Sequence, residues 1–176
     1  MKLTWFAGTT IRIHIGGKIL VADADRAPGS IDRTELVSGA DRLFAMAGTG
    51  LPGLDPAGWR PRPAPRVIDE TAQVPETLVY RLAEGAVLVD AVGEPPVVLL
   101  AGPLAFGRWA DGAVVVLFGT GEALVAAGEK LLDAARPRVI ALAAEEPAID
   151  FAIPALRDRL GGVALVSLEP GLALEV

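Results

Sequence analysis

The stretch TIRIHIGGKILVAD, residues 10–23, has the pattern of a β-hairpin. Three isoleucines alternate with polar residues across 10–15, which is the period of two expected for a strand with one buried face. Gly16 and Gly17 follow as a two-residue turn of the kind that joins antiparallel strands. Residues 18–22 then predict a second, more buried strand, so the chain begins as an antiparallel sheet.

The rest of the chain predicts more strands and, later, helices. We expect strands over 3–6, 42–47, 77–83, 86–92, 97–101, 113–118, 138–143, 163–168 and 172–176. The near-continuous apolar run over 113–118 indicates a strand covered on both faces. Residues 122–135 carry an apolar stripe of helical period and are followed by Pro137. A shorter helix is expected to end near Leu160, with Pro154 in its first turn, and 32–40 is expected to be a short helix or a turn.

This order, β-rich at first and then alternating β and α, favours sheets inside and helices outside. The length of 176 residues fits one domain, expected over 1–176. A net charge of −6 argues against general nucleic-acid binding, and the absence of cysteine excludes disulfides and thiolate metal sites. No apolar run approaches the ~18 residues of a membrane span, and no signal-peptide pattern is present, so we expect a cytoplasmic protein without membrane partners.

Three stretches together resemble the metallo-β-lactamase fold, in its small sugar-phosphate-lactonase-like branch. They are the opening hairpin region 2–23, the helix-to-strand step AARPRVI at 134–140 and the closing LEPGLAL at 168–174. Because both ends match, the resemblance covers nearly the whole chain. It implies an α+β (αβ/βα) four-layer sandwich in which two mixed β-sheets lie inside and helices outside.

The same resemblance implies a metal centre whose ligands this chain lacks. The family holds one or two zinc-like ions with histidines and a bridging carboxylate, and the metal lowers the pKa of a bound water. The positions that match those ligands carry small or turn-forming residues: Gly8, GTGLPG at 48–53, Pro103, and Ala143 or Ala144. Asp23 is the one matching carboxylate that is kept, and a chain with one histidine cannot build the usual site.

Four residues remain as weak candidates for ligand binding: Thr9, Asp23, Glu145 and Glu146. Asp23 begins an acidic cluster with Asp25 and Asp32 that could offer oxygen ligands to Mg²⁺ or Ca²⁺, although capping of loop N–H groups is the favoured role of Asp23. The adjacent Glu145 and Glu146 could act as acid and base, or form a solvated loop. Thr9 would line the former metal cleft together with 48–53 and Gly102-Pro103.

Three other features have two interpretations each. Gly119-Thr120-Gly121 has the position of a dinucleotide-binding turn, but a tight strand-to-helix turn is the simpler account. His14 lies on the polar face of its strand, where it could be a catalytic group or a surface side chain, and the surface role is expected. The proline-rich segment 60–66, with Trp59, could present an extended arm to another chain or form a surface loop.

These observations favour a non-catalytic protein that has lost the metal site, needs no cofactor and acts by binding. The expected partners are a second copy of the chain, an active relative, or a small-molecule ligand. The alternative is a metal-dependent hydrolase of a small phosphorylated or lactone-like substrate, which would use Asp23, Glu145 or Glu146 with an oxygen-ligated metal.

Overall fold

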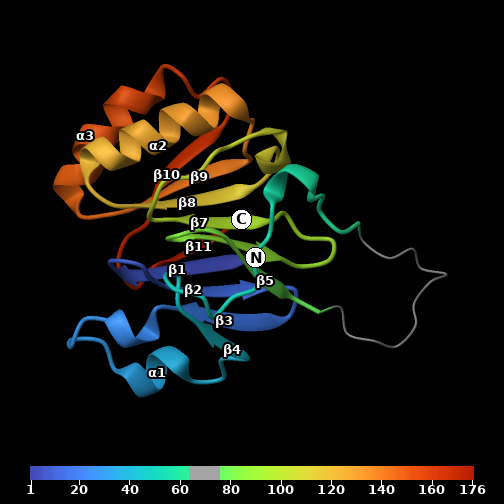
Figure 1. Cartoon of the computed structure of the whole chain (residues 1–176). Coiled ribbons are helices and arrows are strands. Elements are labelled where there is room, and N and C mark those ends of the chain that lie inside the picture. Colours follow the sequence, from blue (N-terminus) through green and yellow to red (C-terminus); the bar gives the residue numbers. More distant parts are fainter. Residues whose placement is uncertain (64–75) are drawn as a thin grey trace.

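The computed structural model describes residues 1–63 and 76–176, which form two β-sheets enclosed by helices (Figure 1). The strands are β1 (Lys2–Ala7), β2 (Thr10–Ile15), β3 (Lys18–Ala22), β4 (Arg42–Phe44), β5 (Leu78–Ala83), β6 (Ala86–Asp90), β7 (Val97–Leu100), β8 (Val114–Phe118), β9 (Val139–Ala143), β10 (Ala164–Ser167) and β11 (Ala173–Glu175). The α-helices are α1 (Arg33–Val37), α2 (Gly121–Ala134) and α3 (Glu146–Arg157), and the 3₁₀ helices are η1 (Ala24–Arg26), η2 (Pro56–Gly58) and η4 (Arg108–Ala110). The predicted α+β class, with two mixed sheets inside and helices outside, is confirmed.

The first sheet, called sheet A, has the strand order β11-β1-β2-β3-β4. The predicted hairpin is its centre: β2 and β3 pair antiparallel, with Ile11 opposite Ala22 and Ile15 opposite Lys18. All three isoleucines of β2 are buried, while Arg12 and His14 between them are half-buried on the outer face. The alternating pattern therefore identified both the strand and the face that it buries.

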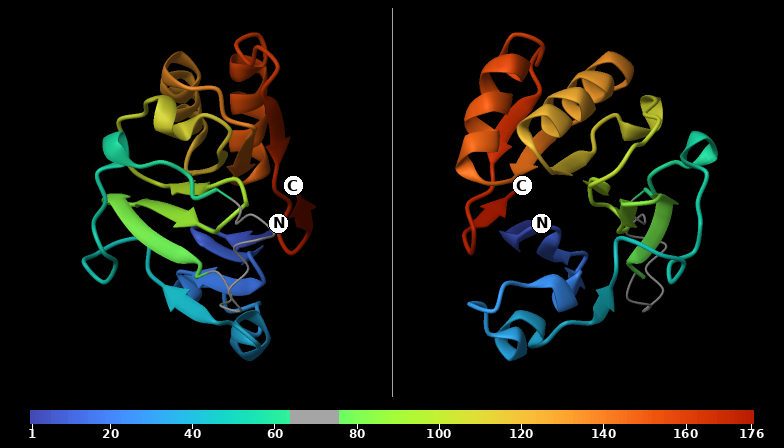
Figure 2. Two further views of the ribbon diagram at one scale, coloured as in Figure 1. Left: turned by 90° about the vertical axis from the view of Figure 1, so that its right-hand side faces the viewer. Right: turned by 60° about the vertical axis from the view of Figure 1, so that its left-hand side comes forward.

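The second sheet, called sheet B, has the order β10-β9-β8-β7-β6-β5, in which β7 to β10 run parallel. The connections between its parallel strands β8, β9 and β10 are α2 and α3, which lie side by side on the outer face (Figures 1 and 2). Gly128 permits this close approach, because a Cβ there would lie 2.8 Å from Cδ1 of Leu156. No helix of the described residues is long and apolar enough to cross a membrane.

Two large apolar cores and a smaller cluster beneath α1 hold the layers together. The first lies between the sheets and includes Trp5, Ile13 and Val116. The second lies between sheet B and its helices and includes Leu124, Ile140 and Leu156. Burial of this much apolar surface is the main stabilising contribution to such a sandwich.

The expected short helix over 32–40 is α1, which begins after Asp32. The Asp32 carboxylate accepts hydrogen bonds from the N–H groups of Thr34 and Glu35, at 2.8 and 3.4 Å. These bonds satisfy donors that have no partner within the helix. Leu36 then packs against Val21 on the outer face of sheet A.

Two predicted positions differ in the structure. Pro154 lies inside α3, since the helix already begins at Glu146 and Pro147 occupies its first turn. The strand predicted over 42–47 ends at Phe44, because the Met46 N–H bonds to a side chain instead of the sheet. Met46 N–H donates to the carboxylate of Asp23, at 3.0 Å.

The proline-rich segment is held against sheet B over its described part. Arg62 forms an ion pair with the buried Asp90, with Nε 2.7 Å from Oδ2, and donates to the carbonyl of Glu76. Residues 64–66 of the predicted arm lie outside the described residues. The described part of this segment is therefore an anchored stretch.

Candidate functional site

Strands of both sheets point their carboxyl ends toward the same end of the molecule. Trp5, near the end of β1, lines a cleft of about 560 Å³ together with Ala144 after β9 and Leu168 after β10. The ends of neighbouring parallel strands are a common place for ligand sites, because loops there converge. We call this region the carboxyl edge and define it by Gly8, Thr9, Asp23, 46–53, Glu84, Gly85, Gly102, Pro103, 144–146 and Glu169.

Asp23 joins three segments of the carboxyl edge. Its Oδ2 accepts from the Thr9 hydroxyl at 2.5 Å, and its Oδ1 accepts from Met46 N–H at 3.0 Å. The residue is 5% exposed and adopts a left-handed backbone, with φ at 47°. Asp and Asn tolerate this conformation better than most residues. Thr9 and Asp23, two of the predicted candidates, are therefore in contact, and each Asp23 carboxylate oxygen already accepts a hydrogen bond.

The loop 46–53 fills the position where the family resemblance implies metal ligands. Met46 and Leu51 are buried in the core between the sheets, so the loop closes this end of the sandwich with apolar side chains. Gly48 N–H donates to Oε1 of Glu84 in the β5–β6 turn, at 3.4 Å. Glu84 was not a sequence candidate, because nothing in the pattern Glu84-Gly85 indicates more than a turn.

The β5–β6 turn also fixes the position of Gly102. Ala101 N–H donates to the Gly85 carbonyl at 2.8 Å, and a Cβ on Gly102 would lie 2.4 Å from the Glu84 carbonyl oxygen. A side chain therefore cannot be placed at 102 without moving the backbone. Pro103, where the resemblance implies a bridging aspartate, follows directly.

Glu145 and Glu146 lie on another part of the carboxyl edge. They line the Trp5 cleft with Glu169, and the Glu145 side chain makes no capping bond to α3. Asp23 does not line this cleft. The structure thus places the four candidates as two pairs, Thr9 with Asp23 and Glu145 with Glu146.

These residues do not fit a metal centre of the kind that the resemblance implies. Within the described residues, no group of three His, Cys, Asp or Glu side chains is placed to hold a metal ion. Asp23 points its oxygens at Thr9 and Met46 N–H, and the matching loops offer glycine, proline and alanine. Structural metal sites need about four ligands and catalytic ones about three, which this arrangement does not provide.

The only histidine is on a different surface. His14 Nε2 accepts from Arg12 Nε at 3.3 Å on the outer face of sheet A, and lines a depression with Lys2 and Glu175. Burial, and after it the charges of Arg12 and Lys2, lowers the pKa of His14 from its ordinary value of 6.5. The neutral imidazole is therefore favoured in the folded protein.

Local structure explains each residue of the turn Gly119-Thr120-Gly121. Thr120 caps α2, its hydroxyl accepting from Ala123 N–H at 3.4 Å. A Cβ on Gly121 would lie 2.8 Å from Cδ1 of Phe151 in α3. Gly119 has a positive φ of 138°, which favours glycine, so the simpler of the two interpretations, a tight strand-to-helix turn, accounts for each residue.

Comparison of the sequence with protein-family models finds no match. Comparison with curated proteins finds none either. The fold, however, is similar to that of Igni18, described as a novel metallo hydrolase from the hyperthermophilic archaeon Ignicoccus hospitalis KIN4/I. The TM-score is 0.52, the identity is 14%, and the match covers 99% of this chain and 98% of that one. The chain therefore has a metallo-hydrolase-like fold, and at this identity the likeness concerns the fold alone.

Proposed function

We propose that this chain is a non-catalytic protein on a metallo-hydrolase-like fold, which has lost the metal site and acts by binding. One observation carries the proposal. Asp23, the carboxylate that matches the family pattern, is 5% exposed and accepts hydrogen bonds from Thr9 and Met46 on separate oxygens. These bonds favour a structural role for Asp23, which connects the loops of Thr9 and Met46.

The loops around Asp23 support the same proposal. Metal ligands must present lone pairs toward a common point. At the carboxyl edge, Met46 and Leu51 instead fill the space between the sheets, and Gly102 lies against the β5–β6 turn. The exposed loop residues Gly48, Thr49 and Gly50 carry no side chain that is a usual metal ligand.

We also place the chain in the sugar-phosphate-lactonase-like branch of the fold. The support is the sequence of three segments that now have definite places: the β1–β3 meander, the step from α2 into β9, and the turn before β11. Each segment is short, so it is their order along the chain that supports the branch.

For the binding partner, we propose a second copy of the chain or a related active protein. Phe151 and Leu172 are large apolar side chains that are 56% and 61% exposed. They line neighbouring clefts that share Glu145 at the carboxyl edge. Exposed large apolar side chains that gather in one region are a feature of association surfaces.

The deciding experiment measures metal content by mass spectrometry on protein purified without an affinity tag, together with thermal melts in zinc, manganese and EDTA. We expect no stoichiometric metal and the same melting temperature in all three conditions. The matched variants are Asp23→Asn and the double variant Glu145→Gln, Glu146→Gln.

Stoichiometric metal that is lost in either variant would overturn the proposal. It would favour the alternative, a metal-dependent hydrolase of a small phosphorylated or lactone-like substrate with a carboxylate site. Light scattering at several concentrations tests the self-association, and a monomer at every concentration would overturn the dimer.

A further inference from the structure

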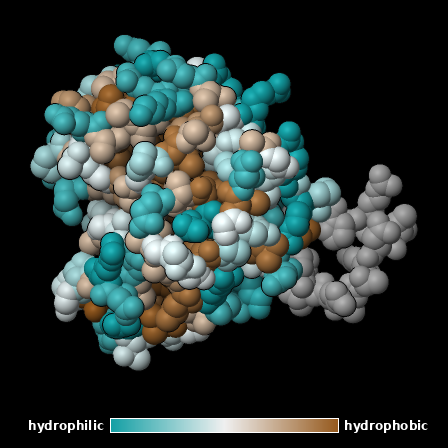
Figure 3. Space-filling model, viewed as in Figure 1, coloured by the Kyte–Doolittle hydropathy of each residue, from teal (hydrophilic) through white to brown (hydrophobic). Residues whose placement is uncertain are grey.

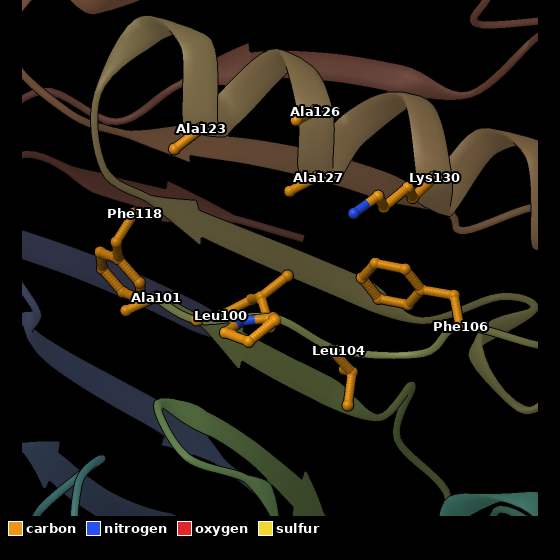
Figure 4. A pocket seen from close by; sticks show the side chains of 11 residues that line it. Leu100, Ala101, Leu104, Phe106, Phe118, Ala123, Ala126, Ala127 and Lys130 are labelled. Carbon is orange, nitrogen blue, oxygen red and sulfur yellow. The ribbon is translucent and has the colours of Figure 1, made fainter.

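An apolar cleft of about 290 Å³ lies between α2 and the segment 101–106, on the outer face of sheet B (Figure 4). It shares Gly102 and Pro103 with the carboxyl edge, and its other residues lie beyond that edge. Its lining is formed by Leu100, Ala101, Gly102, Pro103, Leu104, Phe106, Phe118, Ala123, Ala126, Ala127 and Lys130. Ligand pockets in proteins start at about this volume and are mostly apolar.

The cleft is open because α2 presents small side chains there. Ala123, Ala126 and Ala127 line it from the helix and are too short to reach the opposite wall. Figure 4 shows Phe118 at one end of the cleft and Phe106 at the other. Phe106 stacks on the buried Trp109, with ring centroids 6.1 Å apart, so this end wall is fixed.

Lys130 is the charged side chain of this lining, and Figure 4 shows its amine directed over the cleft beside Phe106. Its amine makes no hydrogen bond or ion pair with the described residues. The acidic side chains nearest to it on α2, Glu129 and Asp133, both pair with Arg159 instead. The Lys130 amine is exposed at the rim of the cleft and is therefore accessible to an anionic ligand.

The apolar surface continues beyond Phe106. A second cleft, of about 570 Å³, shares Pro103, Leu104 and Phe106 with the first and adds Leu82 and Trp109. Hydrophobic residues are also visible between the helices and the sheets on the face shown in Figure 3. A ligand with a long aliphatic tail could therefore follow Pro103, Leu104 and Phe106 into the second cleft, whose lining also includes Asp55, Arg60 and Arg108.

We propose that this cleft binds an unbranched aliphatic carboxylate. The ligand's carboxylate accepts a hydrogen bond from the Lys130 amine, and its aliphatic tail lies against Phe106 and Leu104. A charge-assisted hydrogen bond at the rim orients the ligand, and burial of its aliphatic tail supplies most of the affinity. The site stands whether or not the carboxyl edge holds a metal, because Lys130 and Phe106 lie outside that edge.

Isothermal titration calorimetry with decanoate tests the proposal, with decanol as the uncharged comparison. The intact chain is expected to bind decanoate more tightly than decanol. Lys130→Met should weaken decanoate binding about fivefold, the size of a partly exposed ion pair, and leave decanol unchanged. Lys2→Met is the matched control, since Lys2 is also an exposed lysine but lies on β1, and it should change neither affinity.

A second variant tests where the aliphatic tail of the ligand lies. Ala127→Phe places a ring in the cleft and should abolish binding of both ligands, while circular dichroism shows whether the variant is folded. Absence of decanoate binding to the intact chain would overturn the proposal. Equal decanoate affinity in Lys130→Met and the intact chain would also overturn it, and that result does not depend on the folding of Ala127→Phe. Neither readout involves metal, so failure here is distinct from failure of the proposed function.

Discussion

Sheets A and B share one core but differ on their outer faces. In sheet B, strands β6 to β9 are buried at every position, because α2, α3 and the 101–110 segment cover the outside. In sheet A, β2 keeps a half-exposed outer face that carries Arg12 and His14. The short helix α1 and η1 cover only the part of that face near Val21.

The difference shows how covering sets the sequence pattern. A strand buried on both faces needs apolar residues throughout, and a strand buried on one face needs them at alternate positions. Truncation of one apolar side chain in sheet B should therefore lower the free energy of unfolding by a large amount. Substitutions on the outer face of sheet A should lower it by a small amount. Four predictions test this comparison, from the largest effect to the smallest.

The largest effect is expected for Ile140→Ala in β9. Ile140 is fully buried under the helices of sheet B, so the substitution leaves a cavity and should lower the free energy of unfolding by about 2–5 kcal/mol. Urea denaturation measures the loss. The control is Leu43→Ala in β4 of sheet A, where the side chain is 52% exposed and a change within about 0.5 kcal/mol is expected. Equal losses would contradict the comparison.

Asp23→Ala should have the next largest effect, at the carboxyl edge of sheet A. It leaves Met46 N–H and the Thr9 hydroxyl without their acceptor, at a cost of about 2–3 kcal/mol in unfolding free energy. Asp23→Asn retains an acceptor oxygen and the tolerance for positive φ, so it should lose much less. Similar stabilities of the two variants would show that the Asp23 carboxylate does not hold the segments of Thr9 and Met46 together.

Gly102→Ala is the matching change at the carboxyl edge of sheet B. Its Cβ would meet the Glu84 carbonyl oxygen at 2.4 Å, and the required backbone shift should cost about 1–3 kcal/mol. Gly50→Ala is the control, since a Cβ at 50 has no atom within 4 Å and its φ is not positive. Chemical denaturation of the two variants side by side gives the difference, and a neutral Gly102→Ala would mean that the β5–β6 turn moves freely.

The smallest effect concerns His14 on the open face of sheet A. Because burial and the charges of Arg12 and Lys2 lower its folded pKa below 6.5, the unfolded chain binds the proton more readily. The contribution of His14 to stability is therefore present above pH 6.5 and is lost as the pH falls through the lowered folded pKa. Melting of the intact chain and of His14→Gln at about pH 5 and about pH 8 isolates this contribution. The intact chain should lose more stability than His14→Gln when the pH falls from about 8 to about 5. A smaller loss in the intact chain would contradict the predicted direction.

Much of the secondary structure could be predicted because the signals are local. The alternation in β2, the apolar run of β8 and the stripe of α2 each depend on residues a few positions apart. The prediction for Pro154 was wrong, because α3 begins at Glu146, so that Pro147 lies in its first turn and Pro154 lies inside it. The predicted strand over 42–47 was too long, because the bond that ends it comes from Asp23, far away in the sequence.

The candidate site was predictable only in part. The sequence singled out Asp23 and the glycines after β4, and the structure places them in one region. It did not indicate Glu84, whose contact with Gly48 joins residues 36 positions apart. Nor did it indicate the cleft of Lys130, because its walls come from α2 and from the loop after β7.

The sequence by itself determined the strands, the main helices and which of their residues are buried, because hydrophobic periodicity is a local property of the sequence. The absence of cysteine and the single histidine are likewise matters of composition. The tertiary structure alone decided which residues come together: the Thr9 hydroxyl with the Asp23 carboxylate, Gly102 with the Glu84 carbonyl, and Lys130 with Phe106 in the lining of one cleft. Such contacts join distant segments whose separation is set by the packing of the two sheets, and no local pattern encodes that distance.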